Sequence, residues 1–156
     1  MRSKFILTAL VFFLVSVAWA SVTVTHTETG LQFDLPESWE IEQDGNLLTA
    51  ASPDQSVILM FYVGKADDAA DLLENIADEL DGIIDEPEIT SDDVEEAEIN
   101  GLLQVFIEGT GYYGDDEVDF DLTMVFGGNR TMSIIALGDI DGMQDTIDRI
   151  YSSIRD

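Results

Sequence analysis

The 156-residue chain has no cysteine, one histidine and only six lysine and arginine residues. Without cysteine, it can form no disulfide and carries no thiolate for catalysis or metal binding. The single histidine, His26, rules out histidine-based triads and multi-histidine metal sites unless it serves alone. We interpret it as an ordinary strand residue. There is also no G-x-S-x-G elbow, so nothing indicates a serine hydrolase.

The shortage of cations is the most unusual feature of the composition. Beyond residue 20, only Lys65, Arg130, Arg149 and Arg155 stand against all 33 acidic residues of the chain. Nucleic acid and anionic membrane surfaces are excluded as partners, because both are bound by clustered lysine and arginine. Hydrophobic residues make up 46% of the chain and separate the acids, which indicates a folded domain. The acids could form a solvated coat suited to high salt, capture a cation, or attract a basic partner.

Residues 1–20 have the pattern of a secretory signal peptide. Two cations, Arg2 and Lys4, precede an apolar run that closes on Ala18-Trp19-Ala20. The run is shorter than the ~20 apolar residues of a spanning helix, and no cysteine follows it to carry a lipid. We therefore expect residues 21–156 to form one domain that is exported to a periplasm or the extracellular space. No membrane insertion is expected after cleavage.

The first half of that domain reads as strands. Alternating residues predict a hairpin of two short strands, 22–27 and 31–35. Pro36 should end the second strand, and Trp39 should be a large core side chain at the start of the next. The continuous apolar run at 56–63 predicts a central strand that is covered on both faces.

Two segments have the periodicity of amphipathic helices. Apolar residues recur at helical spacing across 67–84, which predicts one mid-chain helix. A second helix should close the chain, and Asp141 with Gln144 should form a capping box at its start. Its buried stripe is expected to consist of Met143, Ile147, Ile150, Tyr151 and Ile154.

Two long strands, 102–113 and 118–126, follow an acidic loop that runs into a strand over 86–98. In the second of them we expect one apolar core face, and a solvated face with Asp119, Asp121 and Thr123. A loop of residues 127–129 would place Phe126, Met124, Leu122 and Phe120 opposite Arg130, Met132, Ile134 and Ala136. The predicted class is α+β, an antiparallel sheet packed with a mid-chain helix and a C-terminal helix.

Several of these pieces together resemble the PsbP-like family, which has the fold of the extrinsic photosystem II protein and of a nuclear Ran-binding nucleotide-release factor. They are FDLPESWEI at 33–41, the apolar strand, the helix, two long strands around glycine-rich turns, and IDRIYSSIRD at 147–156. All of 21–156 is similar to the small exported bacterial branch of the family. The resemblance implies an α/β/α sandwich with these structural residues: Phe33, Leu35, Pro36, Trp39, Ser153 and Ile154.

The same resemblance implies a non-catalytic accessory or binding module, because family members are best known for docking to larger partners. The photosystem protein docks largely through basic residues, and this chain has almost none. A photosystem partner is therefore not carried over, and the expected protein partner stays unidentified.

A divalent-cation protein is the alternative hypothesis, because hard cations such as calcium favour oxygen ligands. The candidate ligands are Asp119 and Asp121 in one stretch and Asp139 and Asp141 in another. Neither stretch fits the EF-hand pattern, and helix capping by Asp141 or solvated turns would also explain them. We assign no catalytic residue and no other cofactor. A carboxylate-based enzyme is the third hypothesis, and it requires a pocket that holds a carboxylate with a raised pKa.

Overall fold

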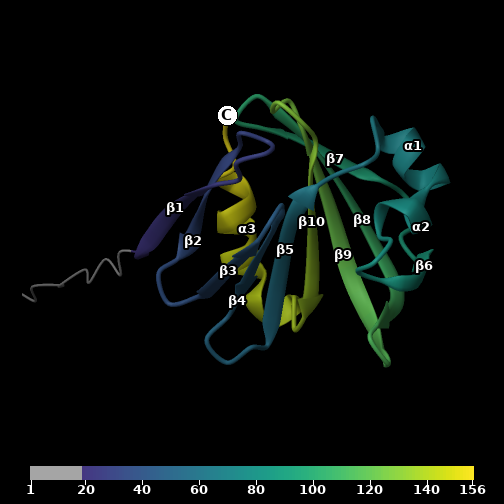
Figure 1. Cartoon of the computed structure of the whole chain (residues 1–156), viewed down its shortest axis with the longest axis horizontal. Coiled ribbons are helices and arrows are strands. Elements are labelled where there is room, and N and C mark those ends of the chain that lie inside the picture. Colours follow the sequence, from purple (N-terminus) through teal and green to yellow (C-terminus); the bar gives the residue numbers. More distant parts are fainter. Residues whose placement is uncertain (1–18) are drawn as a thin grey trace, which may run out of the picture.

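The computed structural model describes residues 19–156, so the signal peptide predicted for 1–20 lies almost wholly outside the described residues. An antiparallel sheet of eight strands forms the centre, in the order β3-β4-β5-β10-β9-β8-β6, with β7 also paired to β8 (Figure 1). A separate hairpin, β1–β2, completes the strands. The strands are β1 (Ser21–Thr25), β2 (Gln32–Pro36), β3 (Glu40–Asp44), β4 (Leu47–Ala51), β5 (Val57–Val63), β6 (Asp85–Ile89), β7 (Glu95–Ile99), β8 (Leu102–Tyr113), β9 (Asp116–Phe126) and β10 (Met132–Gly138). The helices are α1 (Ala69–Glu74), α2 (Ile76–Glu79), the 3₁₀ turn η1 (Asp141–Met143) and α3 (Gln144–Ser152).

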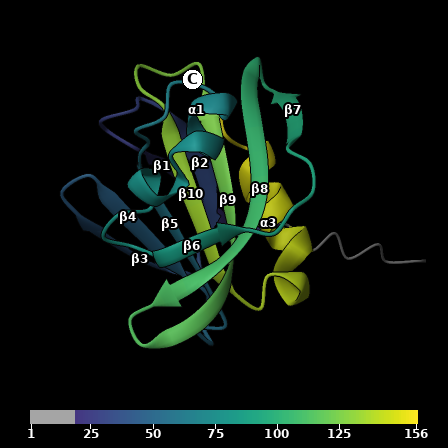
Figure 2. The same cartoon turned by 90° about the vertical axis from the view of Figure 1, so that its right-hand side faces the viewer.

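The sheet is covered on both faces, as the buried run in β5 predicts. Leu59 and Phe61 belong to a core cluster shared with β2 and α3, whereas Met60 and Tyr62 belong to a second cluster shared with α1 and α2. Figures 1 and 2 show the hairpin and α3 on one side of the strands and α1 and α2 on the other. The α+β class and the α/β/α layering are confirmed. Within residues 19–156, no helix is long and apolar enough to cross a membrane.

The residues of the FDLPESWEI segment are structural, as the resemblance implied. Phe33 is fully buried and its ring stacks on Phe61 with centroids 4.2 Å apart. Pro36 is the last residue of β2, and Trp39 is 6% exposed in the same core cluster. At the other end of the chain, the Ser153 hydroxyl accepts the Asp34 N–H at 2.8 Å and donates to the Ile150 carbonyl at 2.6 Å. This hydroxyl fastens the end of α3 to β2.

The predicted mid-chain helix is present, but it is shorter than 67–84 and is interrupted. It consists of α1 and α2, separated at Asn75, which has φ −126° and ψ 34°. The Asn75 side chain donates to the Asp71 carboxylate at 2.8 Å and to the Asp71 carbonyl at 3.2 Å. Such local bonds offer the backbone an alternative to the helical ladder. In α1, Leu72 is buried and Leu73 is 40% exposed.

Helix α2 is tied to the sheet by a buried carboxylate. Glu79 is 2% exposed, and one of its oxygens accepts the backbone N–H groups of Lys65 at 2.8 Å and Ala66 at 3.0 Å. The other oxygen accepts the hydroxyl of Ser133 in β10 at 2.5 Å. The buried carboxyl group therefore has three hydrogen-bond donors, which is the arrangement that a buried carboxylate needs.

Several local predictions differ from the structure. The β9–β10 register is shifted by one residue, because Met132 pairs with Val125 and Ile135 with Leu122. The longer loop leaves Arg130 outside the ladder. Over residues 86–98 the predicted loop and the strand that follows it are present, the strand being β7, but the first residues form a further strand, β6; both strands pair with β8. His26 follows β1 and is buried, donating from Nε2 to the Asn46 carbonyl at 2.8 Å.

Candidate functional site

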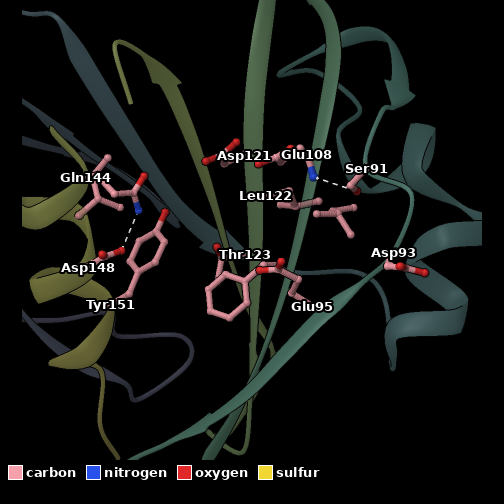
Figure 3. Close-up of a pocket in the computed structure, with 13 residues that line it drawn as sticks. Ser91, Asp93, Glu95, Glu108, Asp121, Leu122, Thr123, Gln144, Asp148 and Tyr151 are labelled. Atoms are coloured by element: carbon pink, nitrogen blue, oxygen red, sulfur yellow. Dashed lines mark hydrogen bonds between the residues drawn. The ribbon is translucent and has the colours of Figure 1, made fainter. Parts of the chain in front are cut away.

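A cavity of about 340 Å³ opens between α3 and the strands β8 and β9 (Figure 3). The predicted solvated face of β9 faces this cavity, and α3 covers part of it. Thr123 and Val125 on that face are buried and Asp121 is half-buried, so the prediction of a wet face is wrong for most of its length. The covering helix makes the difference, because it packs its buried stripe on the strands.

The far wall of the cavity is the segment between β6 and β7. Both strands pair with β8: β6 pairs with residues from Gly109 onward, and β7 pairs with residues up to Phe106. The segment that connects β6 to β7 therefore passes beside Glu108. Thr90 donates its N–H to the Glu108 carbonyl at 2.9 Å, and the Glu108 N–H donates to the Ser91 hydroxyl at 3.3 Å. These bonds fix the Glu108 backbone and hold the wall in place.

Two carboxylates meet on the strands. Glu108 of β8 and Asp121 of β9 are directly opposite in the antiparallel register, so their side chains leave the sheet on the same face. Figure 3 shows the two groups close together at one end of the cavity. Like charges directly opposite each other destabilise a pair of strands. The pair is therefore an energetic cost to the fold.

The environment of Asp121 raises the pKa of its side chain. Partial burial, followed by the carboxylates of Glu108, Asp141 and Asp119, raises its pKa to about 6 from an ordinary value of 3.8. No hydrogen bond among the described residues reaches its side chain, so nothing there stabilises the charged form. This carboxylate changes its charge close to neutral pH.

Tyr151 of α3 brings a polar atom with no partner to the same cavity. The residue is 7% exposed, and its hydroxyl makes no hydrogen bond within residues 19–156. Figure 3 shows the side chain reaching from α3 toward Thr123 and the carboxylates. Burial raises the Tyr151 pKa, the neighbouring Thr123 side chain lowers it in part, and the charges of Asp121 and Asp148 raise it further, so the phenol stays protonated at neutral pH. Buried hydroxyls normally have a partner, so this one is free to bond a ligand.

The four acids predicted as calcium ligands line one depression beside this cavity. It has a volume of about 420 Å³, and Asp119, Asp121, Asp139 and Asp141 all border it. Their arrangement is looser than a coordination sphere, because no three acidic or histidine side chains in the described part of the chain are grouped as metal ligands. Asp139 accepts the Gly142 N–H at 3.1 Å, whereas the predicted capping bond of Asp141 does not form. The calcium site stays a prediction.

The negative charge in both depressions has no neutralising neighbour. Neither lining contains a lysine or an arginine. Three cations have partners elsewhere: Arg155 contacts Asp34 at 3.1 Å, Arg130 contacts Glu28 at 3.4 Å, and Lys65 donates to the Asp78 carbonyl at 2.7 Å. Arg149 lies 5.8 Å from the centre of the Trp19 ring. The site is therefore suited to attract a cation from outside the chain.

Sequence reasoning missed Glu108, Asp148 and the role of the Tyr151 hydroxyl. A signal for Glu108 existed, because Gln104, Phe106 and Glu108 alternate in the sequence and must share one face of their strand. Tyr151 was correctly expected in the buried stripe, yet its polar tip gave no sign of facing a cavity. The carboxylate with a raised pKa in a pocket, required by the enzyme hypothesis, is present in Asp121.

Comparison with known proteins bears on the fold. No family model matches the sequence, and no curated protein matches it. Solved structures do match. Cyanobacterial PsbP (CyanoP) from Synechocystis is 13% identical with a TM-score of 0.57, over 87% of this chain and 92% of that one. LpqN of Mycobacterium tuberculosis, described as involved in cell envelope biogenesis, is 14% identical with a TM-score of 0.50, over 86% of this chain and 89% of that one.

A Bacteroides thetaiotaomicron structure also matches, at 11% identity and a TM-score of 0.55, over 86% of this chain but 47% of that one. Layering, strand order and helix placement thus define an α+β sandwich of a known class. The chain has the PsbP-like fold, which confirms the resemblance seen in its sequence. At such identities the likeness concerns the fold alone.

Proposed function

We propose that the protein is an exported, non-catalytic accessory or binding module of the PsbP-like fold. Its binding site would be the acidic face between α3 and the β8–β9 strands. The observation that carries the proposal is the α3 cavity, which is lined by Glu108, Asp121 and Asp148 and by no lysine or arginine. Such a surface favours a partner that presents a basic group, because complementary potentials set specificity and speed encounter.

The energetic pattern supports a binding role. The fold keeps two carboxylates opposite each other on neighbouring strands, and one of them has its pKa raised to about 6. Groups that reduce stability are concentrated at functional sites, where a ligand offsets the cost. A cationic partner would relieve the repulsion between Glu108 and Asp121 when it binds.

The proposal is tested by affinity capture from the exported fraction of the source cells. The bait is the wild-type protein or the double variant Glu108→Gln/Asp121→Asn. A matched control, Asp116→Asn/Glu117→Gln, removes the same charge from exposed positions at the far end of the β8–β9 hairpin. We expect wild type and control to capture the same protein in a salt-sensitive way and the cavity variant to lose it. Equal capture by all three baits would refute the assignment of the site.

Export is tested separately by cell fractionation and by sequencing the N-terminus of the mature protein. We expect a start at Ser21. Cleavage there would remove Ala20, whose carbonyl accepts the Glu37 N–H at 3.0 Å, and Trp19, which packs against the first core cluster. A protein that stays in the cytoplasm with Met1 intact would contradict the proposal of export.

A calcium-binding protein is the second candidate function. The observation that favours it is that the four predicted ligands border one depression despite coming from two distant stretches of sequence. Thermal unfolding with increasing calcium chloride, against sodium chloride of matched ionic strength, tests this idea. Saturable extra stabilisation that disappears in Asp139→Asn and Asp119→Asn would support it. Equal stabilisation by both salts would rule it out and indicate a solvated acidic coat.

A further inference from the structure

We infer that the α3 cavity binds an alkylammonium group, with the Asp121 carboxylate and the Tyr151 hydroxyl as its polar contacts. The inference rests on the proposed binding function and gives the chemistry of the ligand. The group could belong to a small free amine or to a lysine side chain of a partner protein. Both present an ammonium head on an apolar stem, and comparing a free amine with a lysine-containing peptide separates them.

The polar end of the cavity suits an ammonium head. An ammonium has three N–H donors and needs acceptors. Asp121 and Glu108 supply carboxylate oxygens on the strands, and Asp148 supplies one on α3, where Gln144 already donates to it at 2.8 Å. The Tyr151 oxygen has unused lone pairs within the same cavity.

The unpartnered hydroxyl separates this site from a mere group of acids. Tyr151 is 7% exposed, so water cannot readily solvate its hydroxyl, and a buried polar atom without a partner costs free energy. An ammonium between Tyr151 and Asp121 would satisfy the hydroxyl oxygen and the carboxylate together. The four cations of residues 21–156 are absent from the lining, so no side chain of the domain already fills this role.

The rest of the lining suits an apolar stem. Phe106 and Tyr151 pack against each other as a stacked pair in the wall of the cavity, with ring centroids 6.5 Å apart and planes at 27°. Ile147 of α3 closes the space beside them. Aromatic faces attract a nearby cation as well as packing against methylene groups. The volume of about 340 Å³ is at the small end of the range for small-molecule sites.

The experiment is a titration of the full-length protein with n-butylammonium chloride, followed by amide chemical shifts in NMR spectra. Neutral 1-butanol and sodium chloride of matched ionic strength serve as ligand controls. The variants are Asp121→Asn and Tyr151→Phe, which keep the shape of the side chain, with Asp116→Asn as a matched exposed control on β9. Unfolding curves check that each variant folds.

We expect saturable shifts around the cavity with n-butylammonium and none with 1-butanol. Loss of one bond to a charged group should weaken binding roughly tenfold in Asp121→Asn and several-fold in Tyr151→Phe. Asp116→Asn should bind like wild type. No saturable binding, equal binding of 1-butanol, or unchanged affinity in either cavity variant would overturn the inference.

Two further titrations distinguish a free amine from a partner's lysine, and an ammonium site from a metal site. A peptide with one exposed lysine that binds more tightly than n-butylammonium identifies a partner's lysine, whereas weaker binding of the peptide identifies a free amine. Calcium chloride that produces the same shifts at lower concentration overturns the inference in favour of a metal site. If the amine fails while partner capture still depends on Glu108 and Asp121, the inference fails and the proposed function stands.

Discussion

Replacing Asp121 with asparagine should stabilise the folded protein at neutral pH, although most substitutions in a packed domain destabilise it. The reason is the raised pKa of this carboxylate, about 6 in the folded protein against 3.8 ordinarily. Its ionised form is disfavoured by partial burial and by three neighbouring carboxylates, whereas the unfolded chain solvates it freely. Asparagine has almost the same shape and carries no charge. No hydrogen bond within residues 19–156 is lost with the carboxylate.

The sign and the pH window follow from proton linkage. Between about pH 4 and pH 6 the folded protein binds more protons at Asp121 than the unfolded chain does, so the free energy of unfolding falls as the pH rises. The penalty is absent below this window and complete above it. A shift of this size corresponds to about 3 kcal/mol, which we reduce to ~1–2 kcal/mol because the side chain is only half-buried and solvent screens its neighbours.

The assay is urea unfolding followed by tryptophan fluorescence at several values between pH 4 and pH 7.5. We expect the difference between Asp121→Asn and wild type to grow from near zero at pH 4 to about 1–2 kcal/mol at pH 7. Asp116→Asn, exposed on the same strand, should differ by less than ~0.5 kcal/mol throughout. A gain that does not depend on pH, or that the control variant shares, would refute the electrostatic reasoning.

Three other changes test the packing that positions the site. Glu79→Ala should lower the free energy of unfolding by about 3–5 kcal/mol, because three buried donors lose their acceptor. The control Glu74→Ala, at an exposed position, should lower it by less than ~0.5 kcal/mol. Equal losses of stability for the two variants in calorimetry would contradict the role of Glu79 as a buried acceptor. Ser153→Ala should lower the free energy of unfolding in urea by about 1–2 kcal/mol, whereas Ser152→Ala at an exposed position should change it little. Equal values for the two variants would show that the hydrogen bond from Ser153 to β2 contributes nothing to stability. Phe33→Ala should cost about 3–5 kcal/mol and shift the thermal transition down by at least 10 °C; a shift of only a few degrees would show that the stacked pair is not central.

The overall plan of the protein could be predicted from the sequence because it depends on local patterns. Alternation in residues 22–35, the buried run at 56–63 and the helical stripe around Ile147 each reflect a periodicity that the backbone imposes. Pro36 marks the end of a strand because of its restricted backbone geometry. Trp39 marks a core position because of its size. Together these signals were enough for the α+β class and for the PsbP-like resemblance.

The errors lie where a side-chain bond interrupts an element or where contacts between elements decide. Asn75 interrupts the expected helix, and its side chain bonds to Asp71, a local interaction that competes with the helical backbone bonds. The register of β9 with β10 is one residue from the prediction, because both faces of β9 are partly buried and the apolar pattern alone constrains the pairing weakly. Asp121 was expected on a wet face, since the sequence of a strand does not show which helix will cover it.

The sequence by itself determined the acidic character, the fold class and the candidate aspartates. Only the tertiary structure decided which acids share a site. Residues 91, 108, 121, 148 and 151 are separated by up to 60 positions, and they meet because β6 and β7 share one edge of β8 while α3 lies across β9. The raised pKa of Asp121 and the free Tyr151 hydroxyl exist only in that arrangement. Burial and distance create both properties, and neither is encoded at any single position of the chain.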